Sequence, residues 1–328
     1  MQGFKDLLGL QDEIAENLLL GSLICQLDGS IEKPAIILYG PYGCGKSTIA
    51  SLYRRLIDPT INPLLSIESP ERSLTLSTMK HALPTFDNVG KLTKRTENFL
   101  CRVVTGGGLE RRQLRTNTSS SVMSMRTSFI LTSIEVPTQA PDLLSRCLLI
   151  RVPHREHAEM KSKAEINSIF KEKHPEYLGA LLDAFVKMLQ LRKQTSAATT
   201  SRFQDFEQSV MAGGLAIGIA ASDMNAALIE NQINQVGAIH ANQGFVAVLL
   251  AFLEEKGGFD GPVQLLWASL NEYLLAHDFN AAMLPQSASA LSRSIKPFQT
   301  VLESMGWVVD FSTSTTPNRY VAITKLSN

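Results

Sequence analysis

The chain has 328 residues, of which 44% are hydrophobic and 19% charged, a composition that favours an ordinary folded protein of two or three packing units and argues against disorder. Lysine plus arginine and aspartate plus glutamate each number 31, so there is no overall field to draw the chain onto nucleic acid or an anionic membrane, and such binding would need a local patch. The four cysteines have neither metal-ligand nor disulfide-framework spacing, and no segment has the pattern of a secretion signal or a membrane span, so we expect a cytoplasmic protein with no membrane partner.

Alternating apolar and helix-periodic segments fill the first half of the chain. Leucine and isoleucine at helical spacing predict a helix over 10–28, and the apolar run AIILY predicts a buried strand at 35–39. Similar patterns predict further strands at 83–86, 128–132 and 148–152, and further helices at 46–57 and 93–104. This alternation predicts an α/β fold, a three-layer sandwich of helices around a sheet, over residues 1–153.

The pattern changes after Pro153. Helical periodicity over 155–172, 175–192 and 202–222 predicts a helical subdomain in residues 154–241. A third unit, residues 242–328, is predicted to contain helices at 243–256, 263–276 and 288–304, then strands at 307–311 and 319–323. Three helices followed by a hairpin are typical of a winged-helix module, with Pro297 kinking or interrupting its third helix unless a new helix starts there.

A glycine-rich segment, YGPYGCGKSTIAS, lies between a predicted strand and a predicted helix. Its Gly40, Gly45, Lys46 and Ser47 match the pattern G-x-x-x-x-G-K-[ST] in full. In such a loop backbone N–H groups converge on a β-phosphate, the lysine reaches the β- and γ-phosphates, and the hydroxyl is a Mg²⁺ ligand. We therefore predict ATP and Mg²⁺ as cofactors. The predicted nucleotide-binding residues are Gly40, Pro41, Tyr42, Gly43, Cys44, Gly45, Lys46, Ser47 and Thr48.

The motif LPTFDN supplies an acid directly after an apolar run, so Asp87 is predicted to hold Mg²⁺ together with Ser47, although an aspartate in this position is also common in plain turns. Many related ATPases have a glutamate in the next position, where this chain has Asn88. Either Asn88 orients the attacking water, or Glu68 or Glu71 acts as the base. The residues leave this choice open.

Further segments, FDNVGKL, ENFLCRVVTGGGLERRQLRTN, SFILTSI and PDLLSRCLLIRVP, follow the glycine loop in this order. Together they resemble the AAA+ ATPase module of replication proteins from phages and mobile elements, which is related to the minichromosome-maintenance helicases. The resemblance extends over most of the chain, including SRFQDF and the tail. It implies a P-loop NTPase core with a helical lid and a C-terminal winged-helix domain.

The resemblance also implies roles for single residues. Thr132 occupies the position of a polar sensor, where the family often has asparagine, and Arg146 is similar to the finger that a neighbouring subunit inserts at the γ-phosphate. Arg202 resembles the second sensor. A finger supplied in trans implies a homo-oligomeric ring, with a hexamer as the expected state. The alternatives are a salt-bridged Arg146 and an ordinary helix-start Arg202. The predicted catalytic set is Lys46, Asp87, Asn88, Thr132, Arg146 and Arg202.

Residues 80–126 contain nine lysines and arginines against three acids, the largest local excess in a neutral chain. Within them, RRQLRTNTSSSVMSMR predicts two extended segments around a polar tip, and in the resembled helicases such a hairpin points into the ring channel. We expect backbone contacts to single-stranded or forked DNA, the alternative being a solvated or subunit-interface basic face. The tail is as well suited to packing or protein docking as to DNA binding. The predicted DNA-binding residues are Lys94, Arg111, Arg112, Arg115, Arg293 and Lys296.

The leading hypothesis is a ring-forming, ATP-hydrolysing DNA translocase or helicase for replication of a mobile element or phage. The alternative is a nucleotide-switched DNA-binding loader or regulator without unwinding activity, which the absence of a glutamate after Asp87 favours somewhat. A protein-remodelling ATPase is disfavoured, because no aromatic pore loop is apparent. Since the chain begins almost at the first helix of the module, we expect either a fragment of a longer protein or dependence on a separate loading or primase partner.

Overall fold

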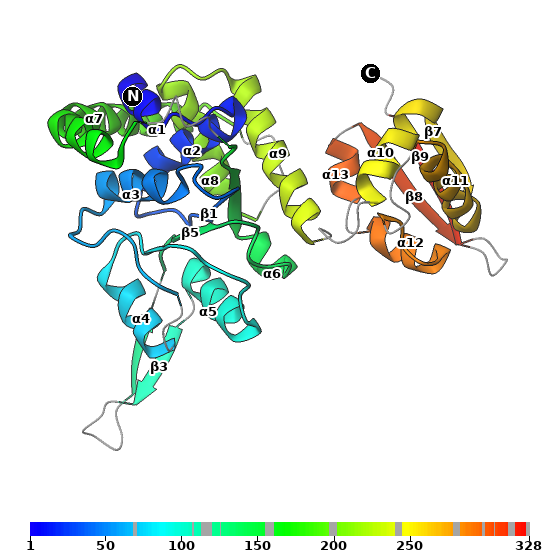
Figure 1. Cartoon of the computed structure of the whole chain (residues 1–328), viewed down its shortest axis with the longest axis horizontal. Helices are drawn as coiled ribbons and strands as arrows, with labels where there is room; N and C mark the ends of the chain where they lie inside the picture. Colours follow the sequence, from blue (N-terminus) through cyan, green and yellow to red (C-terminus); the bar gives the residue numbers. More distant parts are fainter. Residues whose placement is uncertain are drawn as a thin grey trace. The chain divides into compact units, whose positions relative to one another are not determined.

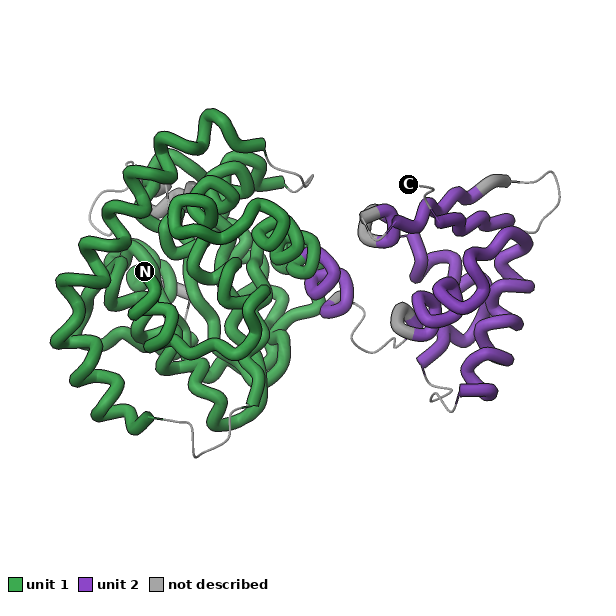
Figure 2. The backbone as a smooth tube through the Cα atoms, turned by 90° about the horizontal axis from the view of Figure 1, so that it is seen from above, with its two compact units in different colours: residues 1–231 green, residues 232–328 purple. Residues whose placement is uncertain are grey.

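The computed structural model describes twelve segments of the chain. They are residues 1–67, 71–106, 108–112, 120–124, 126–154, 161–196, 202–239, 245–277, 283–296, 299–304, 306–313 and 319–325. The chain divides into two compact units, residues 1–231 and 232–328, each of which is described on its own (Figure 2). The finer division of the first unit at residue 153 stays a prediction.

Unit 1 is built on a four-stranded parallel sheet (Figure 1). Its strands, in the order β2-β5-β1-β6, are β2 (Thr85–Phe86), β5 (Ile130–Ser133), β1 (Ala35–Tyr39) and β6 (Cys147–Arg151). Almost every residue of these strands is buried, which is why they read as unbroken apolar runs rather than as alternating ones. The predicted α/β fold with its parallel sheet is confirmed.

The sheet order brings three loops to one edge. Helix α3 (Lys46–Ile57) follows β1 and packs against β1, β2 and β5. Because the strands are parallel, the segments that follow β1, β2 and β5 all leave the same edge of the sheet. This edge therefore gathers the polar residues that come after each strand.

Other elements of unit 1 surround this sheet. Side chains at two helix starts cap the backbone: Asp12 accepts a hydrogen bond from the Ala15 N–H, and Thr93 accepts one from Thr96. These elements are α1 (Gln2–Leu8), α2 (Glu13–Cys25), α4 (Glu71–Lys80), α5 (Lys94–Thr105), β3 (Gly108–Arg112), β4 (Ser120–Ser124) and α6 (Pro141–Leu144). Of the helices among them, α2 and α5 correspond to predicted ones, whereas the sequence pattern does not predict α1, α4 and α6.

The helical part of unit 1 differs from the prediction in two places. The helices expected at 155–172 and 175–192 form one helix, α7 (Lys163–Arg192), with Pro175 inside it; residues 155–160 lie outside the described part. The packing of α7 against α2, α3 and α8 outweighs the hydrogen bond that the proline removes. The single helix expected at 202–222 is wrong, because the chain turns at Gly218, whose φ is 88°. It forms α8 (Gln204–Ala216) and α9 (Ala221–Ile239).

Unit 2 combines helices with a three-stranded antiparallel sheet of order β7-β9-β8. The prediction of two strands is wrong, because β7 pairs with β9 as well. The helix predicted at 288–304 is interrupted, as expected from Pro297: one helix ends before this proline and another begins after it. Its elements are α10 (Phe245–Lys256), β7 (Gly258–Pro262), α11 (Val263–Ala276), α12 (Ala288–Ile295), α13 (Gln299–Ser304), β8 (Trp307–Thr313) and β9 (Arg319–Lys325).

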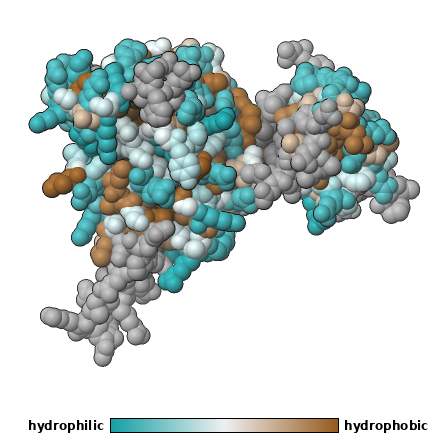
Figure 3. Space-filling view, viewed as in Figure 1, coloured by the Kyte–Doolittle hydropathy of each residue, from teal (hydrophilic) through white to brown (hydrophobic). Residues whose placement is uncertain are grey.

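The described surface is mixed in character. The visible face of unit 1 is mainly hydrophilic, with scattered hydrophobic side chains (Figure 3). Among the described residues, no helix combines the length and the apolar character needed to cross a bilayer.

Candidate functional site

Three glycines give the loop after β1 its shape. Gly40, Gly43 and Gly45 have φ angles of 153°, 74° and 95°, in the region that side chains disfavour. A Cβ on Gly40 would lie 2.1 Å from the carbonyl oxygen of Val152, whereas at Gly43 and Gly45 it would meet nothing within 4 Å. At Gly40 both the lack of space for a side chain and the backbone torsion require glycine, whereas at Gly43 and Gly45 only the torsion does.

Lys46 is the first residue of α3 and is held inside the loop. Its ammonium donates to the carbonyl oxygens of Gly40 at 2.8 Å and Pro41 at 2.6 Å, and lies 3.5 Å from Cys44 Sγ. Gly45, the N-cap of α3, has no side chain to occupy the first N–H groups of the helix. The ammonium and these amides form a cationic, hydrogen-bond-donating concavity suited to a phosphate.

Asp87, which follows β2, brings the predicted metal ligands together. Ser47 Oγ donates to Asp87 Oδ1 at 2.7 Å, and Thr132 Oγ1, at the end of β5, donates to the same oxygen. A hydroxyl and a carboxylate are hard oxygen donors of the type that Mg²⁺ prefers. Within the described segments there is no cluster of three His, Cys, Asp or Glu that could hold a metal.

Asn88 has an unusual backbone. Its φ of 54° makes it the one non-glycine residue with positive φ in the described part of the chain. Its N–H donates to Thr132 Oγ1 at 2.9 Å, and its side chain is exposed. Asparagine tolerates this left-handed region better than most other residues. Of the alternative bases, Glu68 lies outside the described residues and Glu71 is described only by its place in α4.

Two hollows flank the first turn of α3. The smaller, about 330 Å³, is lined by the glycine loop, by Leu7 and Leu8 of α1, and by Lys161, Lys163 and Ile166 at the start of α7. The larger, about 790 Å³, runs along α3 between the segment 60–66 and α7. The residues of α1 and α7 were missed from the sequence, because α1 was not predicted and no motif marks a lysine at a helix start.

Arg146 lies at the opposite edge of the sheet. Its carbonyl oxygen accepts from the Ala35 N–H at the start of β1, whereas the glycine loop follows the end of this five-residue strand, so roughly 15 Å separates them. Its guanidinium is hydrogen-bonded to the carboxylate and the carbonyl of Asp142, and its Nε is buried without a partner. A single chain therefore does not bring Arg146 to Lys46.

Arg202, just before α8, is exposed, and its guanidinium lies 5.9 Å from the ring centroid of Phe203. The pKa of the Asp142 carboxyl is lowered chiefly by its hydrogen bond from Arg146, and the charge of Arg202 adds to this effect. The two predicted arginines thus share Asp142 as an electrostatic partner.

The predicted DNA-binding residues are spread over both units. Lys94, 73% of whose side chain is exposed, forms an ion pair with Glu97 at 3.6 Å. In unit 2, Arg293 is exposed and donates to its own helix at Ser289, while Lys296 lies 5.7 Å from the Phe311 ring.

The predicted extended segments around the polar tip form an antiparallel hairpin of β3 and β4. Arg111 and Arg112 lie on β3, and their side chains are outside the description; Arg115 and the tip of the hairpin lie outside the described residues.

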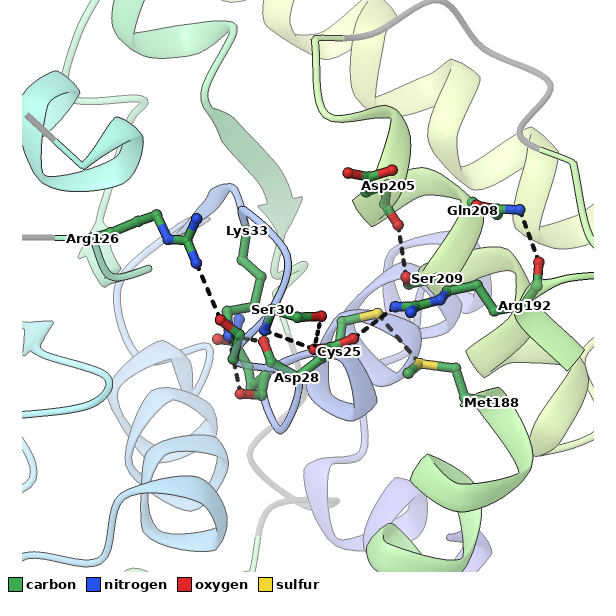
Figure 4. Close-up of polar contacts among 12 residues, drawn as sticks. Cys25, Asp28, Ser30, Lys33, Arg126, Met188, Arg192, Asp205, Gln208 and Ser209 are labelled. Carbon is green, nitrogen blue, oxygen red and sulfur yellow. Dashed lines mark hydrogen bonds and ion pairs between the residues drawn. The ribbon is translucent and has the colours of Figure 1, made fainter. Parts of the chain in front are cut away.

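A polar network links the base of this hairpin to the helices α7 and α8 (Figure 4). Arg126 donates to the carbonyl oxygen of Gly29 at 3.1 Å. In the same loop, Asp28 accepts from Ser30 and, at 2.7 Å, from Arg192 at the end of α7. The carbonyl of Arg192 in turn accepts from Gln208 of α8 at 2.8 Å. The loop 26–33 is therefore bonded on one side to the hairpin and on the other to α7.

The fold and this site define a mixed α/β protein with a parallel sheet and a glycine loop at the sheet's carboxyl edge. Residues 4–233 match the family model of the actinomycete integrative conjugative element replication protein, and residues 245–328 match the C-terminal domain of the RepA protein of these elements. The chain belongs to this family of replication proteins.

Solved structures with similar folds are remote. A structure titled "SCCmec type IV Cch - active helicase" is 12% identical, with a TM-score of 0.42 over 96% of this chain and 66% of the other. The NrS-1 C-terminal region (305–718) is 14% identical, with a TM-score of 0.41 over 98% and 78%. A JCV helicase structure is 14% identical, with a TM-score of 0.26 over 64% of each chain. No curated protein matches the sequence.

Proposed function

We propose that this chain is a ring-forming ATPase of the AAA+ type that translocates on or unwinds DNA during replication of its conjugative element. The observation that carries the proposal is the meeting of Lys46, Ser47 and Asp87 at the carboxyl edge of the parallel sheet. Membership of a replication-protein family supports a role on DNA. In this proposal the sheet and its helices are a P-loop three-layer sandwich, α7 and α8 belong to the lid, and unit 2 is a winged-helix domain.

ATP and Mg²⁺ would bind at the loop. The amides of residues 43–48 and the Lys46 ammonium would neutralise the phosphates, and Ser47 and Asp87 would hold the metal ion, which lowers the charge of the terminal phosphates when bound. The Thr132 hydroxyl donates to Asp87, so it fixes the direction of this carboxylate. Asn88, whose side chain is exposed next to Asp87, would orient the attacking water.

The base would occupy the smaller hollow. Leu7, Leu8 and Ile166 line this hollow and offer the base apolar surface. The cationic lining of the rest of the hollow is suited to the phosphates.

A second copy of the chain would complete the site. Arg146 bonds Asp142 at the edge of the sheet opposite the glycine loop of its own chain, and the charge of Arg202 also acts on this carboxyl. From a neighbouring copy they would stabilise the charge that develops on the γ-phosphate. This division between copies supports a homo-oligomer, for which a hexameric ring is the proposed form.

The DNA would contact the hairpin of β3 and β4 through Arg111, Arg112 and Arg115, and further contacts would come from Lys94 at the start of α5 and from Arg293 and Lys296 of unit 2. A separate loading or primase partner and a cytoplasmic setting belong to the same proposal.

The decisive experiment compares the wild type with Lys46→Ala in ATPase and unwinding assays on single-stranded and forked DNA. We expect DNA-stimulated hydrolysis and strand displacement by the wild type, and loss of both, by a factor of about 100 or more, in the variant. Lys171→Ala, a lysine on the exposed surface of α7, is the control. Hydrolysis that Lys46→Ala leaves unchanged contradicts the proposal.

The second candidate is a nucleotide-switched loader or regulator, and Asn88 in place of a glutamate favours it. It predicts ATP-dependent assembly on DNA with slow hydrolysis and no strand displacement. The same assays separate the two candidates.

A further inference from the structure

Two lysines at the start of α7 face the glycine loop. Lys161 and Lys163 line the smaller hollow together with Gly45, Lys46 and Ser47. Lys163 also lines the larger hollow, again with Ser47. Both lysines are exposed, and among the described residues neither ammonium has a hydrogen-bond or ion-pair partner.

The charge around these lysines has one sign. Among the described residues, the lining of the two hollows contains Lys46, Arg55, Lys161 and Lys163 and no aspartate or glutamate. The starts of α3 and α7 both lie at this lining, and a helix start carries partial positive charge. Glu165 in the first turn of α7 lines neither hollow.

This arrangement is suited to an anion. Cations repel one another and are unfavourable at a helix start, so a negatively charged ligand in the hollow would be stabilised there. The lining carries cations in addition to Lys46, which suits a ligand with more than one phosphate group.

Arg202, which the resemblance suggests as the second sensor, contributes with Arg146 to the lowered pKa of the Asp142 carboxyl and lines neither hollow. Lys163 is a cationic side chain that lines both hollows and has no hydrogen-bond or ion-pair partner among the described residues.

We propose that Lys163, assisted by Lys161, binds the phosphate chain of the nucleotide held by the glycine loop of the same chain. The proposal rests on the proposed function, since it needs a nucleotide in this loop. It gives α7 a direct contact to the nucleotide, distinct from the arginines that a second copy would supply.

The test measures the affinity of the full chain for ATP with Mg²⁺ by titration calorimetry, at several salt concentrations, for the wild type, Lys163→Ala, Lys163→Arg and Lys171→Ala. We expect Lys163→Ala to weaken ATP binding by about tenfold or more, because a charge-assisted hydrogen bond to phosphate is lost. Lys163→Arg should restore most of the affinity, and Lys171→Ala, on the same helix but lining neither hollow, should bind as the wild type.

Salt dependence separates a phosphate contact from a structural role. If Lys163 contacts phosphate, the fall of affinity with salt is less steep in Lys163→Ala than in the wild type, while the unfolding temperatures of the two proteins stay close. The inference is wrong if Lys163→Ala binds ATP as tightly as the wild type, or if Lys163→Arg loses as much affinity as Lys163→Ala. Either result leaves the proposed function standing. If the wild type binds ATP no better than Lys46→Ala does, both the proposed function and the inference are wrong.

Discussion

Asn88 combines a backbone constraint with a proposed chemical role. Its N–H holds the Thr132 hydroxyl at 2.9 Å, and that hydroxyl bonds the Asp87 carboxylate. Asn88 adopts this contact with a left-handed φ of 54°. Its main chain therefore supports the Asp87 carboxylate through Thr132, and its side chain stays exposed beside the site.

Two substitutions separate these functions. Asn88→Gly keeps the backbone conformation at little cost, so we expect its free energy of unfolding to change by less than about 0.5 kcal/mol while ATP turnover falls about tenfold or more. Asn88→Glu should cost about 1 kcal/mol of stability, because a glutamate disfavours this conformation. Chemical denaturation and steady-state ATPase assays measure the two effects. Full turnover by Asn88→Gly would assign the water to another residue.

Among single residues, the sequence predicts those site residues that belong to a motif of fixed spacing. Lys46, Ser47 and Asp87 are brought together as the motifs indicate. The bond from Thr132 to Asp87 joins residues 45 positions apart and depends on the strand order β2-β5-β1, which no local pattern contains. Lys163 lies outside every motif, because its proximity to the loop results from how α7 packs on α3.

Among the elements, the loop 26–33 joins three parts of unit 1. Asp28, at the centre of this loop, is 6% exposed and pairs with Arg192 of α7. Burial by itself raises the pKa of the Asp28 carboxyl, but the hydrogen bonds from Ser30 and the charge of Arg192 together outweigh it, and the net pKa is lowered. The ionised carboxylate is thus the form that stabilises the fold.

The lowered pKa of Asp28 determines the direction in which its contribution to stability changes with pH. The stabilisation from Asp28 is fully present above the pKa of an unfolded aspartate, near 4, and is lost as the pH falls through the lower pKa of the folded state. We expect Asp28→Asn to cost about 1–2 kcal/mol at pH 7 and progressively less below about pH 4. Urea unfolding of both proteins between pH 3 and 7 measures the difference. A cost that is constant over this range would contradict the role of the carboxylate charge.

The elements that the sequence predicts best are those whose signals are local. The boundaries of α3 and α11 agree with the prediction, since a glycine loop precedes one and Pro262 the other. The two prolines within predicted helical regions have different effects. Pro175 lies inside α7, where tertiary packing tolerates it, whereas Pro297 lies between two helices. Strand β7 was missed because its sequence, GFDGP, has a low strand propensity and is held by pairing with β9.

For the whole molecule, the geometry of the sheet divides the predicted catalytic set into two groups. Lys46, Ser47 and Asp87 lie at the carboxyl edge, and Arg146 lies at the amino edge beside the start of β1. A rigid chain cannot join the two groups, because the strands fix their separation at several residue lengths. Two copies can, if the amino edge of one approaches the carboxyl edge of the other. This head-to-tail contact can repeat from copy to copy, as the proposed ring requires.

Mixing two inactive variants tests this division. Lys46→Ala removes the loop's cation and Arg146→Ala removes the finger, so each homogeneous assembly should lose ATPase activity by about 100-fold or more. In a mixture, an interface in which an Arg146→Ala copy supplies the loop and a Lys46→Ala copy supplies Arg146 is intact. We therefore expect mixing to restore about a quarter of the wild-type activity at an equal ratio, if exchange between copies is random and each site works independently. The double variant mixed with wild type is the control for exchange. If the mixture is as inactive as its components although exchange is demonstrated, or if Arg146→Ala alone is fully active, Arg146 does not act on a neighbouring copy.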